Sequence, residues 1–92
     1  MKISLIGTGA IGGTIAKKLV KAGHKVSIAN SRGKESVRKF AEEIGAEPRD
    51  LETISNDAEV LILSIPFGAI PKLPKIIFKN LPKNSIVIDT NN

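Results

Sequence analysis

The stretch MKISLIGTGAIGG, residues 1–13, decides the fold, because it places a glycine-rich turn directly after a short apolar strand. The nearly continuous hydrophobic run at residues 3–6 is typical of a parallel strand that is covered on both faces. Gly7, Gly9 and Gly12 follow with the spacing G-x-G-x-x-G, and a segment of helical periodicity comes next. A strand before these glycines and a helix after them is the context in which the spacing predicts dinucleotide binding.

Each of the three glycines has a separate physical task in such a turn. Gly7 permits the tight turn out of the strand, Gly9 lets the backbone approach a pyrophosphate, and Gly12 lets the helix pack closely on the sheet. The helix then starts with free N–H groups and the positive end of its dipole near the phosphates. The alternative is a glycine-rich turn of another α/β protein that binds no dinucleotide.

The segment after the glycines completes a βαβ unit. Four apolar residues fall on one face of the expected helix: Ile11, Ile15, Leu19 and Val20. Lysines lie toward the other face, Gly23 is a suitable residue to end the helix, and residues 26–29 supply a second strand. The unit spans about thirty residues, as a dinucleotide-binding unit does.

The rest of the chain continues the alternation of helices and strands. The pattern predicts a helix over 37–44 ended by Gly45, an edge strand over 46–49 and a short helix capped by Asp50. It then predicts a buried strand over 60–65, a helix starting near Pro74 and a last strand over 86–88. Right-handed crossovers then give a Rossmann-type, doubly wound parallel α/β sheet of about five strands in the order 3-2-1-4-5. We expect three αβα layers, with two helices on each face, and a cofactor crevice at the carboxyl ends of the first and fourth strands.

The residues after the second strand indicate which dinucleotide is bound. NAD-specific domains usually carry Asp or Glu there, but this chain has Asn30, and no carboxylate occurs until Glu35. Ser31 and Arg32 follow, with Lys34 close behind, and a guanidinium can pair with a 2′-phosphate. This pattern favours NADP(H) over NAD(H). The alternative is that Arg32 and Lys34 are only solvated loop residues.

Composition narrows the remaining function classes. The 92 residues form one small domain without cysteine and with one histidine, so we expect no disulfide and no metal site. No secretory signal or long apolar run is present, so we expect a cytoplasmic protein without membrane association. The net charge of +5 comes from scattered basic residues with only three aromatics, so we expect no nucleic-acid partner. No catalytic triad or carboxylate pair can be assembled.

Four motifs together carry a family resemblance: IGTGAIGG at 6–13, N-S-R at 30–32, S-I-P at 64–66 and V-I-D-T-N-N at 87–92. With them, the whole chain resembles the NADP oxidoreductases related to coenzyme F420-dependent (deazaflavin) NADP reductases, and more distantly the pyrroline-5-carboxylate reductases. The resemblance implies that Thr8, Ala10 and Ile11 touch the pyrophosphate. It also implies that Ser31, Arg32 and Lys34 hold the 2′-phosphate, and that Ile65 and Pro66 line the nicotinamide side.

The candidate cofactor-binding residues are therefore Gly7, Thr8, Gly9, Ala10, Ile11, Gly12, Asn30, Ser31, Arg32, Lys34, Ser64, Ile65 and Pro66. We assign no catalytic residue. Members of the family continue into a second, largely helical domain, so we expect residues 1–92 to be the NADP-binding domain without the substrate and dimerisation domain. The unpaired edge at 86–88 then predicts a homodimer, or association with a separate substrate-binding chain.

Two functions follow from this resemblance. The first is the NADP(H)-binding domain of an oxidoreductase that transfers hydride between NADP(H) and a second substrate such as a deazaflavin. We expect it to be inactive without a second domain, because the acceptor must be held against the nicotinamide. The alternative is a stand-alone module that senses NADP(H) or docks onto another subunit without catalysis.

Overall fold

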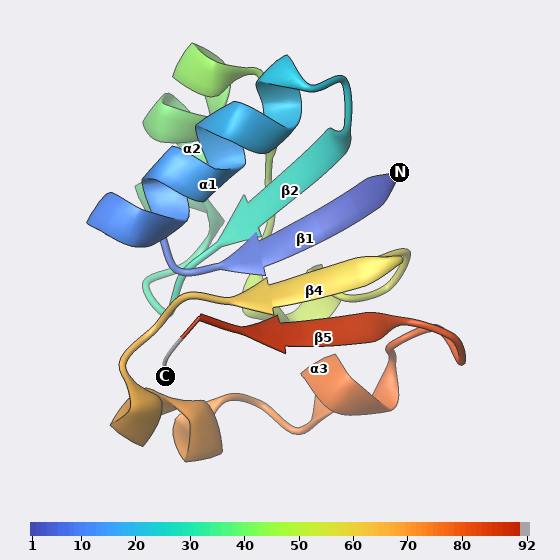
Figure 1. Cartoon of the computed structure of the whole chain (residues 1–92). Helices are drawn as coiled ribbons and strands as arrows, with labels where there is room; N and C mark the ends of the chain where they lie inside the picture. Colours follow the sequence, from blue (N-terminus) through green and yellow to red (C-terminus); the bar gives the residue numbers. More distant parts are fainter. Residues whose placement is uncertain (91–92) are drawn as a thin grey trace.

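Five parallel strands form one sheet in the order β3-β2-β1-β4-β5 in the computed structural model, which describes residues 1–90 (Figure 1). Their bounds are β1 (Lys2–Ile6), β2 (Lys25–Ala29), β3 (Glu47–Pro48), β4 (Val60–Leu63) and β5 (Ile86–Asp89). The strand order and the parallel pairing confirm the predicted doubly wound fold. Two residues of the V-I-D-T-N-N motif, Asn91 and Asn92, lie outside the described residues.

Helices cover both faces of this sheet, so the three predicted layers are present. The long helices α1 (Ala10–Lys21) and α2 (Lys34–Ile44) pack on one face. The other face is covered by three short helices: the 3-10 helices η1 (Leu51–Thr53) and η2 (Phe67–Lys72), and the single-turn α3 (Ile76–Lys79). The expectation of two helices on each face was therefore wrong for the second face.

The sequence between β4 and β5 explains that difference. Pro71 lies inside η2, and α3 starts at Ile76, two residues after Pro74, which agrees with the predicted helix starting near Pro74. Proline lacks an N–H, so two prolines three residues apart prevent one continuous helix. The helically spaced apolar residues still turn inward: Ile77 is fully buried, and three partly buried ones pack against the same core, namely Ile70, Leu73 and Leu81.

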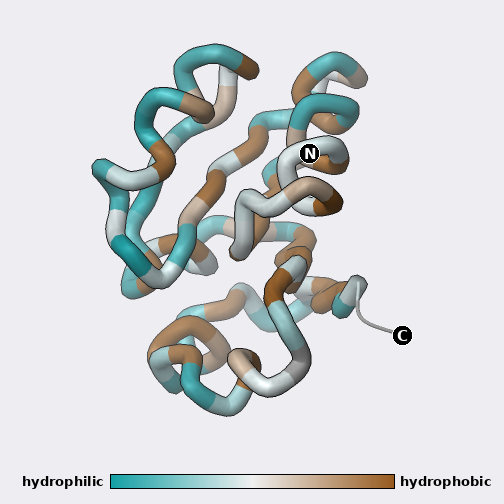
Figure 2. Tube along the Cα trace, turned by 90° about the vertical axis from the view of Figure 1, so that its left-hand side faces the viewer, coloured by the Kyte–Doolittle hydropathy of each residue, from teal (hydrophilic) through white to brown (hydrophobic). Residues whose placement is uncertain are grey.

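The two cores follow from the alternation of side chains along each strand. Leu5 and Ile28 face α1 and α2, whereas Ile6 and Leu61 face the short helices, and all four are essentially inaccessible to solvent. Hydrophilic and hydrophobic residues alternate along the two long helices (Figure 2), as expected of helices with one face on a core.

The start of α1 departs from the predicted apolar face. Ile11 is 64% exposed, and the buried residues of the helix are Gly12, Gly13 and Ala16. Small residues are needed here because the first turn of the helix lies against the glycine-rich turn and against α2, where a Cβ on Gly13 would lie 3.2 Å from Cζ of Phe40. The other predicted inward residues, Ile15, Leu19 and Val20, are partly buried and do pack against the core.

Asp50 and the end of β4 also differ in detail from the sequence prediction. Asp50 precedes η1, as expected, but its side chain does not cap that helix. Its Oδ1 atom instead accepts a hydrogen bond of 2.7 Å from the backbone N–H of Lys34, in the first turn of α2. The strand predicted over 60–65 ends at Leu63, although the N–H of Ser64 still donates to the carbonyl oxygen of Ile6 at 2.8 Å.

Candidate cofactor-binding site

The glycine-rich turn begins at a position that only glycine can occupy. Gly7 has a φ of +103°, a conformation that L side chains rarely adopt. A Cβ at this position would lie 2.1 Å from the carbonyl oxygen of Ser64 and 2.9 Å from Cγ2 of Ile65. The N–H of Gly7 donates to the carbonyl oxygen of Ala29 at 2.8 Å. The turn is therefore fixed between the carboxyl ends of β2 and β4.

Gly12 brings the first turn of α1 onto this glycine turn. A Cβ on Gly12 would lie 2.3 Å from the carbonyl oxygen of Gly7 and 3.1 Å from Oγ of Ser64. The predicted close packing is confirmed, but the backbone that Gly12 approaches belongs to the turn itself rather than to the strands. Gly7, Gly12 and Ser64 thus form one tightly packed group from three segments of the chain.

Gly9 is different because its side toward solvent is open. It is exposed, it is the N-cap residue of α1, and nothing lies within 4 Å of the position that a Cβ would occupy. Ala10 and Ile11, which follow it in the helix, are also exposed, and the first turn of α1 contains no acidic residue. This surface presents the positive end of the α1 dipole, which favours an anionic group.

The loop after β2 is held by the side chain of Asn30. Its Oδ1 atom accepts hydrogen bonds from the backbone N–H of Arg32 at 2.9 Å and from the hydroxyl of Ser36 at 2.5 Å. Asn30 is only 8% exposed, and its Nδ2 atom is buried without a hydrogen-bond partner among the described residues. Asn30 therefore fixes the backbone of the loop, while Ser31 and Arg32 remain exposed.

A cavity of about 260 Å³ lies beside this loop. Its lining residues are Asn30, Ser31, Arg32, Gly33, Asp50, Leu51 and Glu52. The sequence reasoning missed four of them as site residues: Gly33, Asp50, Leu51 and Glu52. The predicted topology contained the signal, because the carboxyl ends of the neighbouring strands β2 and β3 meet at the same edge of a parallel sheet.

The remaining predicted residues lie at the carboxyl end of β4. Ser64 and Ile65 are half-buried beside the glycine turn, and Pro66 is exposed where η2 begins. The structure thus brings Gly7, Gly12, Ser64 and Ile65 together. The residues of the loop after β2 form the wall of a separate cavity, so the candidate residues make up two adjoining regions of one sheet edge.

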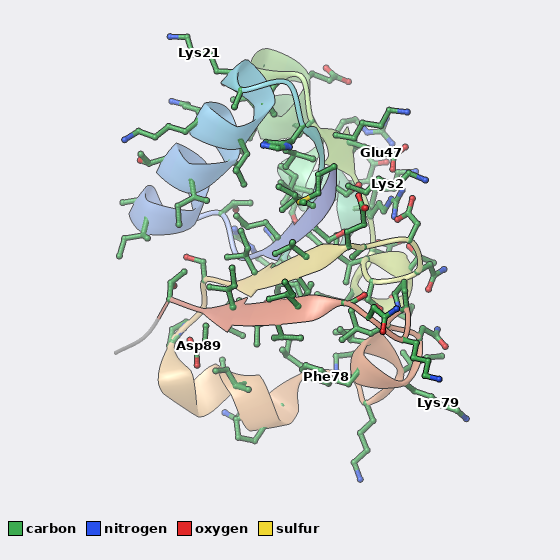
Figure 3. All side chains as sticks on the ribbon, turned by 45° about the vertical axis from the view of Figure 1, so that its right-hand side comes forward. Lys2, Lys21, Glu47, Phe78, Lys79 and Asp89 are labelled. Carbon is green, nitrogen blue, oxygen red and sulfur yellow. The ribbon has the colours of Figure 1, made fainter. Side chains whose placement is uncertain are left out.

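A larger cavity, of about 440 Å³, lies at the opposite end of the sheet. Figure 3 shows Lys2 and Glu47, which line it, far from Asp89 at the carboxyl end of β5. The guanidinium of Arg49 lies 2.7 Å from Asp57, and this hydrogen bond lowers the pKa of Asp57 and raises the pKa of Arg49. The cavity has no glycine-rich turn, so we do not consider it the cofactor site despite its size.

Neither a metal-ligand cluster nor a membrane-spanning helix occurs in residues 1–90. No group of three or more His, Cys, Asp or Glu residues is placed there to hold a metal ion. No helix in the same part of the chain is long and apolar enough to cross a membrane.

The sequence matches the family described as NADP oxidoreductase, coenzyme F420-dependent, over residues 2–92. The chain belongs to this family. The resemblance inferred from the glycine turn and the N-S-R and S-I-P motifs is thereby confirmed, and the chain is a domain of an NADP oxidoreductase family. No curated protein gave a significant match.

Several solved structures share the fold of this family member. Arogenate dehydrogenase from Synechocystis has a TM-score of 0.83 and 26% identity, covering 99% of this chain and 33% of that one. A proposed NADP oxidoreductase from Bacteroides fragilis has a TM-score of 0.81 and 29% identity, and the match covers 98% of this chain and 35% of that one. A proposed F420-dependent NADP reductase from Arthrobacter has a TM-score of 0.84, and the match covers 100% of this chain and 45% of that one. Its sequence identity is 23%, so this likeness supports the fold alone. The chain spans between a third and just under half of these proteins.

Proposed function

We propose that this chain is the NADP(H)-binding domain of an oxidoreductase that transfers hydride between NADP(H) and a second substrate such as a deazaflavin. The open side of Gly9 is the observation that carries the proposal. Gly7 and Gly12 are glycines because protein atoms surround them, whereas no protein atom within 4 Å explains a glycine at position 9. The space left there fits the approach of a pyrophosphate to the start of α1.

The other residues of the site support the same ligand. The exposed Ala10 and Ile11 would flank the pyrophosphate beside Thr8, and Ile65 and Pro66 would lie on the nicotinamide side. Bound NADPH would supply the hydride, and this chain would hold and orient the dinucleotide for that transfer. The family match over residues 2–92 supports an NADP oxidoreductase domain.

A preference for NADP(H) over NAD(H) rests on the loop after β2. Arg32 is exposed at the cavity of about 260 Å³, and its backbone is fixed by Asn30. The position that carries a carboxylate in NAD-specific domains holds the neutral Asn30. Arg32, with Ser31 and Lys34 nearby, would therefore bind the 2′-phosphate.

The hydride acceptor would be held outside the described residues. The chain covers 33% to 45% of the three related structures, so most of each of those proteins lies beyond this domain. We assign the acceptor site to further protein, either in the same polypeptide or in a separate chain. A deazaflavin acceptor is suggested by the family description.

A second candidate function is a stand-alone module that senses NADP(H) or docks onto another subunit without catalysis of its own. The exposed edge strand β5 favours it, because Ile86, Val87 and Ile88 are 59%, 44% and 45% exposed. Apolar side chains on an unpaired strand edge favour association.

We propose that a second copy of this chain pairs along β5, and sedimentation over a range of concentrations tests this. Dimers that Ile88→Glu abolishes are expected, and a strict monomer at high concentration would exclude pairing.

Calorimetric titration with NADPH and NADH tests the cofactor proposal. The wild type should bind NADPH more tightly, and Arg32→Ala should remove most of the difference. A charge-assisted hydrogen bond is worth roughly 1.5–3 kcal/mol, which corresponds to about a ten- to hundredfold loss of NADPH affinity. Lys39→Ala is the control, since Lys39 is an exposed positive charge in α2 that does not line the cavity. Equal affinity for both cofactors in wild type and variant would disprove the preference.

Turnover tests where the acceptor is held. Both candidate functions predict that the purified chain binds NADPH without oxidising it in the presence of a deazaflavin acceptor. Steady oxidation by the purified chain would show that these residues suffice to hold the acceptor, and would overturn its assignment to further protein.

A further inference from the structure

The cavity that we assign to the 2′-phosphate contains more negative than positive side chains. Among the described residues that line it, Arg32 is the one basic residue, whereas Asp50 and Glu52 contribute two carboxylates. A site selected only for tight binding of a phosphate would not place two carboxylates in its wall, because like charges repel across a few ångströms. The two carboxylates in the cavity lining therefore need an explanation that phosphate binding by Arg32 does not give.

Asp50 is held in this wall by a defined interaction. Its Oδ1 atom lies 2.7 Å from the backbone nitrogen of Lys34 and accepts its hydrogen bond. Gly33, the N-cap residue of α2, has a φ of +95°, and a Cβ there would lie 3.8 Å from the same Oδ1 atom. The carboxylate thus sits at the positive end of the α2 dipole, at a place that also attracts phosphate groups.

We propose that Asp50 is a specificity-determining residue that limits the preference of this site for a 2′-phosphate; the proposal rests on the cofactor-binding function given above. Arg32 attracts the 2′-phosphate, and Asp50, which lines the same cavity, opposes it. The carboxylate also occupies one N–H of α2 that a phosphate could otherwise use. The net result is moderate rather than strong discrimination between NADP(H) and NAD(H).

The structure offers a conservative variant with which to test this role. Asp50→Asn removes the charge and keeps an oxygen that can accept the Lys34 hydrogen bond, so the start of α2 is retained. The second lining carboxylate gives an independent variant, Glu52→Gln. Glu43→Gln, in the last turn of α2, makes the same change of net charge away from the cavity.

The experiment measures the binding of two fragments, 2′,5′-ADP and 5′-ADP, to each variant by calorimetry. Asp50→Asn should tighten 2′,5′-ADP about three- to tenfold and leave 5′-ADP unchanged, since it removes one negative charge from the lining of the cavity proposed for the 2′-phosphate. The gain should shrink in 0.5 M salt. Glu52→Gln should change the ratio of the two affinities in the same direction, and Glu43→Gln should leave the ratio unchanged.

Different failures of this experiment have different meanings. If the wild type binds neither fragment nor NADPH, the proposed cofactor function fails. If it binds NADPH but Asp50→Asn leaves the ratio of fragment affinities unchanged or lowers it, only the role of Asp50 is disproved. A change in the thermal midpoint with an unchanged ratio would likewise show that Asp50 serves only as the cap of α2.

Discussion

A Cβ on Gly7 would lie 2.1 Å from the carbonyl oxygen of Ser64, 57 positions later in the sequence. The turn after β1 and the end of β4 therefore lie in close contact. These two segments cannot move apart without breaking the hydrogen bond from the N–H of Ser64 to the carbonyl oxygen of Ile6. Gly9, two residues away, has open space at the same position. The same turn therefore contains a glycine needed for the fold and a glycine available to a ligand.

Gly7→Ala should destabilise the protein strongly. The left-handed backbone costs roughly 1–2 kcal/mol for a residue with a Cβ, and the overlap with Ser64 adds to it, so we expect a loss of about 2–4 kcal/mol. Urea unfolding measures this loss. Gly23→Ala is the matched control, because Gly23 has a similar φ of +95° but nothing within 4 Å of its Cβ position. Equal losses in the two variants would show that the Ser64 contact is unimportant.

Gly9→Val should abolish NADPH binding and leave the fold intact. The new side chain would fill the space that the pyrophosphate needs, while no protein atom stands in its way. The loss of a favourable N-cap residue should cost about 1 kcal/mol of stability. Calorimetry measures the binding, and circular dichroism with urea unfolding checks the fold. Normal NADPH binding by a folded Gly9→Val variant would mean that the glycine pattern is only a turn.

Asn30→Asp should move the cofactor preference toward NADH. An aspartate can keep the hydrogen bonds from Arg32 and Ser36, but it replaces the unpartnered Nδ2 group with a charged oxygen. That oxygen can accept a bond from a ribose 2′-OH and repels a 2′-phosphate, so the ratio of NADPH to NADH affinity should fall about tenfold or more. Titration with both cofactors measures the ratio. An unchanged ratio would place the ribose away from Asn30.

The pairing of Arg49 with Asp57 should make stability depend on pH in acid. The hydrogen bond from Arg49 holds the pKa of Asp57 below its usual value. A depressed pKa adds stability above the unfolded pKa, which is about 4, and this stability is lost as the pH falls through the lower folded pKa. Asp57 is 41% exposed, so solvent screening limits the contribution to about 1 kcal/mol at neutral pH.

Urea unfolding of wild type and Asp57→Asn between pH 7 and pH 2 checks this prediction. The wild type should be the more stable at pH 7, and the difference should disappear in the most acidic samples. A difference that stays constant over the whole range would show that the charge of Asp57 does not contribute.

Much of the fold could be predicted from local patterns. The apolar runs and glycines predicted the five strands and the two long helices, because each pattern reflects a repeat of two or of 3.6 residues. Right-handed crossovers between these elements then predicted the strand order. The segment between β4 and β5 was harder, since Pro71 and Pro74 interrupt the helical pattern and two short helices replace one. The exposure of Ile11 was missed because periodicity does not reveal that Gly12 must approach the carbonyl of Gly7.

The sequence by itself determined the doubly wound sheet, the family and the residues at its carboxyl edge, because spacing and composition are local properties of the chain. Only the tertiary structure decided which atoms surround each of these residues. It closed the space around Gly7 and Gly12 and left it open at Gly9. It also brought Asp50 onto the first turn of α2 and into the lining of the same cavity as Arg32. Such contacts join residues far apart in the chain, and they form only when the strands are laid side by side.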